Sequence, residues 1–182
     1  RVLLHAEESM EIFIEIMQWL GHKMGPLLLQ FPYFNKKAFL GPSPFLKRLE
    51  EFLMRFTAEV PLVVEVRNPT WIHRDLVEVV EGCGATLAWV DQGWMPKANE
   101  WLDRLESPGT KRSYFRFLGD RQQTEALTET WGEQVLDPKE RLQPWVEIMK
   151  SSAASGGEVF GFFNNHYAGH APATLEDFRT LW

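Results

Sequence analysis

The chain has 182 residues, 45% of them hydrophobic, with eight tryptophans and thirteen phenylalanines, so it has enough apolar material for a core and is not a disordered chain. A formal net charge of −6 disfavours nucleic-acid binding through phosphate contacts, although four basic residues gather locally: Lys111, Arg112, Arg116 and Arg121. A single cysteine excludes an intrachain disulfide and fits a reducing compartment. We find no long apolar span and no signal peptide, so the sequence predicts a cytoplasmic protein.

The first half of the chain alternates helix and strand patterns. A helix is expected from about residue 7, ending near Gly21 and burying one apolar face: Ile12, Phe13, Ile16, Met17 and Leu20. A buried strand at 25–32 follows, and then a helix at 41–56 in which Ser43 is the N-cap and Pro44 the first helical residue. The chain begins at Arg1 and enters the first helix almost at once, so we expect it to be part of a longer protein.

The second half repeats the alternation. A strand at 61–69 precedes a short helix at 73–84, and a third strand lies at 85–91. Residues 92–112 form a long connection, with a short helix expected around 99–105. The remaining expected elements are a strand at 113–119, a helix opened by Asp137 and Pro138, a strand at 158–164 and a helix opened by Thr174.

Five strands, each followed by a helix, predict an α/β fold with a parallel sheet. Two architectures agree with this pattern: an open doubly wound sheet, and part of an eight-stranded barrel. Nothing in the composition marks a linker, so we expect residues 1–182 to form a single domain.

Polar residues gather where the apolar strands end, which is where parallel α/β proteins bind their ligands. These residues are Gln30, Glu65, Arg67, Asp91, Arg116, Asn164 and Asn165. Side chains two apart on a strand share a face, so Glu65 and Arg67 project together and Val64 and Val66 project oppositely. By the same rule we expect one lumen to hold Glu65, Arg67, Asp91, Arg116 and Asn164. A competing interpretation is a buried structural network of charges.

The segment at 162–178 combines asparagines, histidines and a glycine-permitted bend before the last helix. His166 and His170 are four apart, but no further ligand pattern accompanies them, so the sequence gives little support to a metal site. An anion or a ligand hydroxyl, held by Asn164, Asn165 and the amides of the following helix, is the favoured hypothesis. Trp71 is either a platform that stacks on a ligand or a core residue.

Four motifs, LGHKMGPLLLQFP, VVEVRNPTW, YFRFLGD and FFNNHYAGHAPATL, resemble the YecE-like family, also called domain of unknown function 72. The resemblance implies a TIM-like (β/α) barrel, here incomplete with about five βα units and lacking the family's N-terminal strands. The family has no established activity. Its polar positions include Gln30, Glu65, Arg67, Asn68, Trp71, Asp91, Arg116, Asn164, Asn165, His166 and Gly169, whereas Leu118 replaces a histidine common in the family.

Two functions are open at this point. The first is an enzyme acting on a small polar, anionic or sugar-like substrate, with Glu65 or Asp91 as general acid or base. Its substrate-binding residues would be Gln30, Arg67, Trp71, Arg116, Asn164, Asn165 and His166. The second is a non-catalytic module that binds a nucleotide or a nucleic-acid end through the basic residues near Arg112 and Arg121. The sequence does not identify a cofactor; if a divalent metal takes part, Glu65, Asp91 and His166 are its expected ligands.

Overall fold

A computed structural model describes residues 6–109 and 111–182 of the chain. Its sheet has five strands: β1 (Leu27–Gln30), β2 (Leu62–Glu65), β3 (Thr86–Gln92), β4 (Arg112–Gly119) and β5 (Glu158–Phe163). The α-helices are α1 (Glu7–Gln18), α2 (Pro42–Phe56), α3 (Arg74–Gly82), α4 (Ala98–Leu105), α5 (Arg121–Glu125), α6 (Lys139–Ala154) and α7 (Ala171–Leu181). Three short 3₁₀ turns complete the described elements: η1 (Gly21–Lys23), η2 (Pro69–Trp71) and η3 (Asn165–Tyr167).

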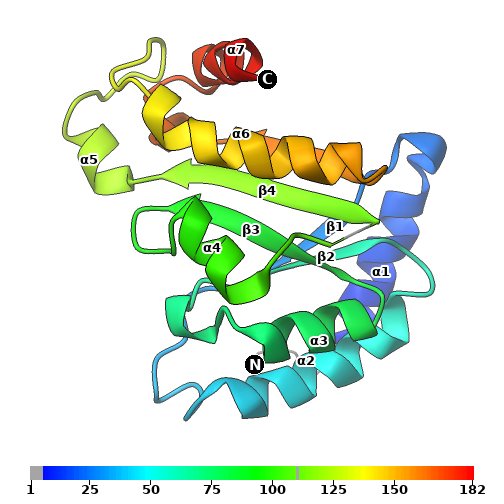
Figure 1. The fold of residues 1–182 in the computed structure, drawn as a ribbon. Coiled ribbons are helices and arrows are strands. Elements are labelled where there is room, and N and C mark those ends of the chain that lie inside the picture. The colour runs from blue at the N-terminus through cyan, green and yellow to red at the C-terminus, as the bar shows by residue number, and fades with distance from the viewer. Residues whose placement is uncertain (1–5, 110) are drawn as a thin grey trace.

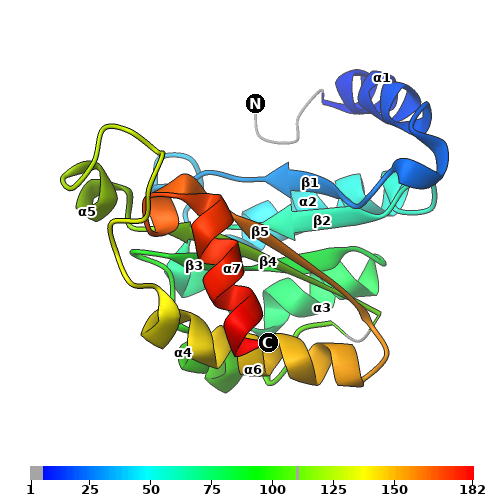
Figure 2. The same ribbon diagram turned by 90° about the horizontal axis from the view of Figure 1, so that it is seen from above.

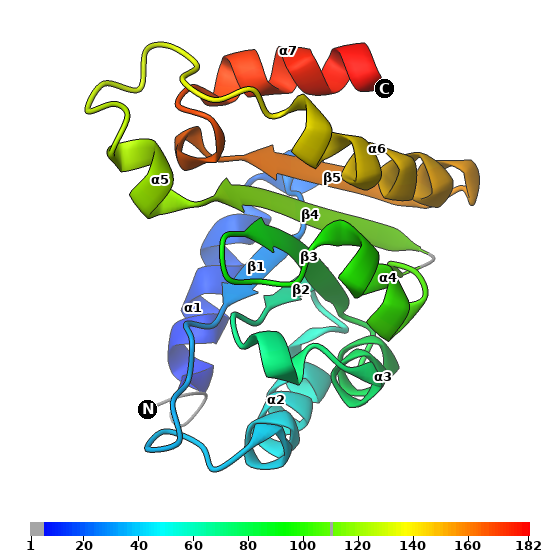
Figure 3. The ribbon, with the colours of Figure 1, turned by 60° about the vertical axis from the view of Figure 1, so that its left-hand side comes forward.

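All strand pairs are parallel, and the strands lie in the order β1-β2-β3-β4-β5. A doubly wound sheet reverses its strand order and carries helices on both faces. Here each strand lies beside the one before it, and α2, α3, α4 and α6 follow one another around the outside of the sheet (Figures 1 and 3). The fold is therefore part of a TIM-like barrel.

The sheet is strongly curved. In a flat sheet β1 and β4 would lie three strand spacings apart, about 14 Å. Instead, the Arg116 guanidinium on β4 donates a hydrogen bond of 2.9 Å to the Gln30 side chain on β1. The two side chains meet across the concave face, which is the barrel lumen. Within the described residues β1 and β5 are the edges of this arc, and Figure 2 shows it from above.

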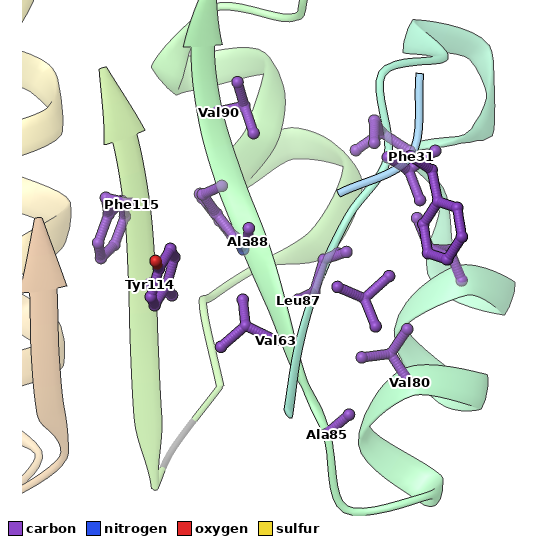
Figure 4. Close-up of a cluster of buried hydrophobic side chains, with 14 of the residues drawn as sticks. Phe31, Val63, Val80, Ala85, Leu87, Ala88, Val90, Tyr114 and Phe115 are labelled. Atoms are coloured by element: carbon purple, nitrogen blue, oxygen red, sulfur yellow. The ribbon is translucent and has the colours of Figure 1, made fainter. Parts of the chain in front are cut away.

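The core lies between the convex face of the sheet and the helices. Trp89 of β3 is stacked on Trp101 of α4, with ring centroids 5.2 Å apart, and meets Trp145 of α6 edge-on. Figure 4 shows Leu87 on the side of β3 that faces Val80 of α3. Alternate residues of β3 thus pack against successive helices, while the residues between them on the strand point into the lumen.

Some local details differ from the sequence-based expectation. Along α1 the buried residues are Met10 and Ile14, whereas Ile12, Phe13 and Ile16 are 52%, 42% and 57% exposed, so the expected buried stripe is wrong. Several helix starts also shift: α2 begins at Pro42 after Gly41, α6 at Lys139, and α7 at Ala171. The helix α5 and the 3₁₀ turns had no clear signal in the sequence. None of the described helices is long and apolar enough to cross a membrane.

Candidate functional site

A buried carboxylate joins two arginines at the lumenal end of the strands. Glu65 closes β2 and is fully buried. Its Oε1 accepts a hydrogen bond of 2.7 Å from Arg67 Nε, and its Oε2 accepts one of 2.5 Å from Arg116 Nη1. The same Arg116 nitrogen donates to Gln30 Oε1. Residues on or just after β1, β2 and β4 therefore form one connected polar network.

The strand register explains why these side chains meet. Gln30 of β1 is paired with Glu65 of β2, so both project from the same face. Arg67 lies two residues beyond Glu65 on the same face. Two guanidiniums against one carboxylate leave a charge of +1 at the site. The side chains of Arg67 and Arg116 keep 22% and 19% exposure, so donors not used by Glu65 remain accessible at the mouth of the lumen.

Asp91 does not join this network, and the expectation that it shares the lumen with Glu65 is wrong. It lies on the same side of β3 as Trp89, which faces the helices. Arg141 of α6 donates to both Asp91 oxygens, at 3.0 Å from Nε to each and 2.5 Å from Nη2 to Oδ1. The Tyr167 hydroxyl of η3 donates to Oδ2 at 2.5 Å, and the Arg141 guanidinium lies 4.9 Å from the Tyr167 ring centroid.

These contacts make the buried Asp91 carboxylate the centre of a clamp between β3, α6 and η3. Burial raises the pKa of the Tyr167 phenol, and the Asp91 charge raises it further, so the hydroxyl stays protonated and donates. Burial opposes the charge of Arg141, but its hydrogen bonds to Asp91 and the negative charge of that carboxylate outweigh this and raise the Arg141 pKa. The arrangement positions the segment after β5.

Replacing Tyr167 with phenylalanine tests the clamp. The substitution removes the donor to a buried carboxylate while keeping the ring that packs edge-on against Phe117. We expect the free energy of unfolding to fall by about 2 kcal/mol, the range for hydrogen bonds to charged groups. Urea denaturation followed by circular dichroism measures the change. An unchanged midpoint would show that Arg141 alone satisfies Asp91.

Trp71 is a core residue, so of its two interpretations from the sequence the core residue is confirmed and the ligand-stacking platform is wrong. Its side chain is only 8% exposed and lies in an aromatic cluster. The ring is stacked on Phe34 at a centroid distance of 5.9 Å and contacts Phe39 and Phe45. The neighbouring Asn68 clamps the loop after β1, because its amide exchanges two 2.8 Å hydrogen bonds with the Phe34 backbone.

The asparagines after β5 mainly organise the backbone. Asn164 Oδ1 accepts from the His166 backbone N–H at 2.9 Å and lies 2.7 Å from His166 Nδ1. Asn165 Oδ1 accepts from the Ala171 N–H at 2.8 Å, so it already occupies the start of α7, where we expected an anion. His166 Nε2 lies 3.2 Å from Glu125 Oε1, and its ring packs on Trp131.

The expected metal ligands and basic patch are not assembled. Among the residues that the structure describes, no group of three or more His, Cys, Asp or Glu side chains is placed to hold a metal ion. Glu65, Asp91 and His166 have the separate partners described above. Arg112 and Arg121 flank the two ends of β4, about 25 Å apart along the strand, and are paired with Glu158 and Glu125 respectively.

No local sequence pattern indicated two residues that contact the predicted site residues. Arg141 and Glu125 lie on helices 50 and 41 residues from their partners Asp91 and His166. A cavity of about 600 Å³ lies on the Asp91 side of the sheet. Most of the charged residues that line it are acidic, and its basic residues are Lys97 and Arg141. Its acidic residues are Asp91, Glu100, Asp120, Asp137 and Glu140. This cavity is therefore less suited to an anion than the lumenal arginines.

Comparison with known proteins agrees with the barrel. A DUF72 family protein from Thermotoga maritima MSB8 is 23% identical, with a TM-score of 0.68 over 97% of this chain. A DUF72 family protein from Enterococcus faecalis V583 is 17% identical, with a TM-score of 0.66 over 96% of the chain. At these identities the likeness shows the fold alone. The chain spans 65% of the length of each of these solved chains.

No curated protein matches the sequence significantly. The model of the family described as "Protein of unknown function DUF72" matches residues 1–182, the whole of the chain. The YecE-like resemblance of the four sequence motifs is thereby confirmed, and the chain belongs to the DUF72 family.

Proposed function

We propose that the protein binds a small anionic substrate through Arg67 and Arg116 at the lumenal mouth, and that it is an enzyme acting on this substrate by general acid–base chemistry. One observation supports this most directly. A fully buried Glu65 holds both guanidiniums in place but neutralises only one of their two charges. Arginine forks fixed in this way are suited to carboxylate and phosphate groups.

Glu65 is the acid–base group at the site in this proposal. Both of its oxygens accept hydrogen bonds from arginine in the ligand-free structure. It becomes available as a base only when the anionic group of the substrate takes over one guanidinium and frees an oxygen. Asp91 lies on the opposite face of the sheet and has no part in this scheme.

Isothermal titration calorimetry with phosphate, sulfate and acetate tests the binding step. We expect Arg116→Ala to weaken anion binding at least about tenfold, because it removes a charge-assisted donor. Arg116→Lys keeps the charge but lacks the planar fork, so binding should be weakened here too. Circular dichroism checks that both variants are folded.

Arg112→Ala is the matched control for this experiment. Arg112 lies at the other end of the same strand, its side chain is 24% exposed, and it is also paired with a glutamate. Its loss should leave anion binding unchanged. If the wild-type protein binds none of the anions, or if Arg112→Ala weakens binding as much as Arg116→Ala, the proposed function is wrong.

A further inference from the structure

An aromatic surface adjoins the arginine pair on the lumenal face. The Tyr114 ring is stacked on Phe162 of β5, with ring centroids 4.9 Å apart and an interplanar angle of 26°. It is also stacked on Phe160, at 6.2 Å and 29°. Tyr114 is buried, whereas Phe162 is 47% exposed. One side of the Phe162 ring therefore packs on Tyr114, while nearly half of the residue is accessible within the part of the barrel that the structure describes.

The strand register places this surface directly beside Arg116. Arg116 of β4 is paired with Phe162 of β5, and paired residues of neighbouring strands project from the same face. Tyr114 lies two residues before Arg116 and shares that face. Burial raises the pKa of Tyr114, the Arg116 charge lowers it and the Glu65 charge raises it, so the phenol lies within reach of both charges.

We propose that the ligand of this site is an aromatic anion, whose ring lies on Phe162 while its carboxylate or phosphate is held by Arg116 and Arg67. The proposal rests on the proposed function and deepens it by naming the substrate class. Aromatic rings prefer offset stacking at the spacing already present between Tyr114 and Phe162. A ligand ring on Phe162 would continue this stack.

The charge of the site favours a small anion over a protein segment as the occupant of the aromatic surface. If strands covered this face with apolar side chains alone, the excess positive charge of the two arginines would be left without a counter-charge. Here the exposed ring and the excess positive charge stand side by side on paired residues. A ligand with a flat apolar body and an anionic end satisfies both features at once.

The test compares benzoate with cyclohexanecarboxylate, which has the same charge and a similar size but no π-system. Calorimetry on the wild-type protein should show benzoate binding about fivefold tighter, the range of one aromatic stacking contact. Phe162→Leu keeps an apolar side chain and should abolish this preference while leaving cyclohexanecarboxylate affinity unchanged. Phe162→Tyr keeps the ring and should retain the preference, which also guards against an effect of misfolding.

The outcomes separate this inference from the proposed function. If the wild type binds neither carboxylate nor inorganic phosphate, both fall. If phosphate binds but benzoate does not, or if the two carboxylates bind equally, the anion site stands and the aromatic inference is overturned. It is also overturned if Phe162→Leu weakens both carboxylates equally, because Phe162 would then be a general apolar contact.

Discussion

Substitution of Gly119 with alanine is expected to destabilise the protein by about 4 kcal/mol, a large effect for a single change, because it combines backbone strain with a steric conflict. Gly119 ends β4 with a φ of +74°, in the left-handed region that other residues rarely adopt. A Cβ at this position would lie 2.4 Å from the His166 carbonyl oxygen and 2.4 Å from Tyr167 Cα. Both are backbone atoms, so no side-chain rotation relieves the contact.

Gly156→Ala separates the two causes. Gly156 also has a positive φ, +82°, but a Cβ there would meet nothing within 4 Å. Its substitution should cost only the conformational penalty, about 1 to 2 kcal/mol. Thermal and urea unfolding of both variants gives the comparison. Equal losses would mean that η3 moves away from β4 at little cost, contrary to the close approach seen here.

Replacement of Glu65 with glutamine is the second large effect that we expect. The substitution keeps the shape of the side chain but leaves the two arginines without their buried counter-charge. Removing one partner of a buried ion pair costs about 3 to 5 kcal/mol, and the partial exposure of both arginines places the expected loss near 3 kcal/mol. Urea denaturation at neutral pH measures it.

The matched control is Glu158→Gln, which removes the partner of Arg112 at the opposite end of the barrel strands. The Glu158 side chain is 63% exposed, so this pair should contribute no more than about 1 kcal/mol. A loss at Glu65 as small as that at Glu158 would show that water compensates Arg67 and Arg116 fully. The network would then not hold the arginines in place.

Strand positions were predictable from the sequence because the apolar runs are short and bounded by Gly and Pro. The period of two also placed Glu65 and Arg67 on a shared face. Family resemblance supplied the barrel, which periodicity alone left open against a doubly wound sheet. These local rules were sufficient to predict which side chains share a face when the residues lie on the same strand or on strands that are neighbours in the chain.

The error at Asp91 had a different origin. Asp91 was predicted to project into the lumen, but it lies with Trp89 on the helix-facing side of the sheet. Trp89 packs between helices α4 and α6, and such a bulky buried aromatic was the available signal for the helix-facing side. Arg141, which neutralises Asp91, approaches from a helix 50 residues away, and no local pattern indicates that pairing.

The hydrogen bond between Gln30 and Arg116 joins residues 86 positions apart in the chain. We expect this contact to form after β1, β2, β3 and β4 have assembled and curled, because closing so long a loop earlier carries an entropic cost. The polar lumen is then expected to form late in folding. Substitutions in this network should mainly accelerate unfolding and leave the folding rate nearly unaltered. The unfolding rate of the native state would then depend on Arg116, the residue to which we also assign ligand binding.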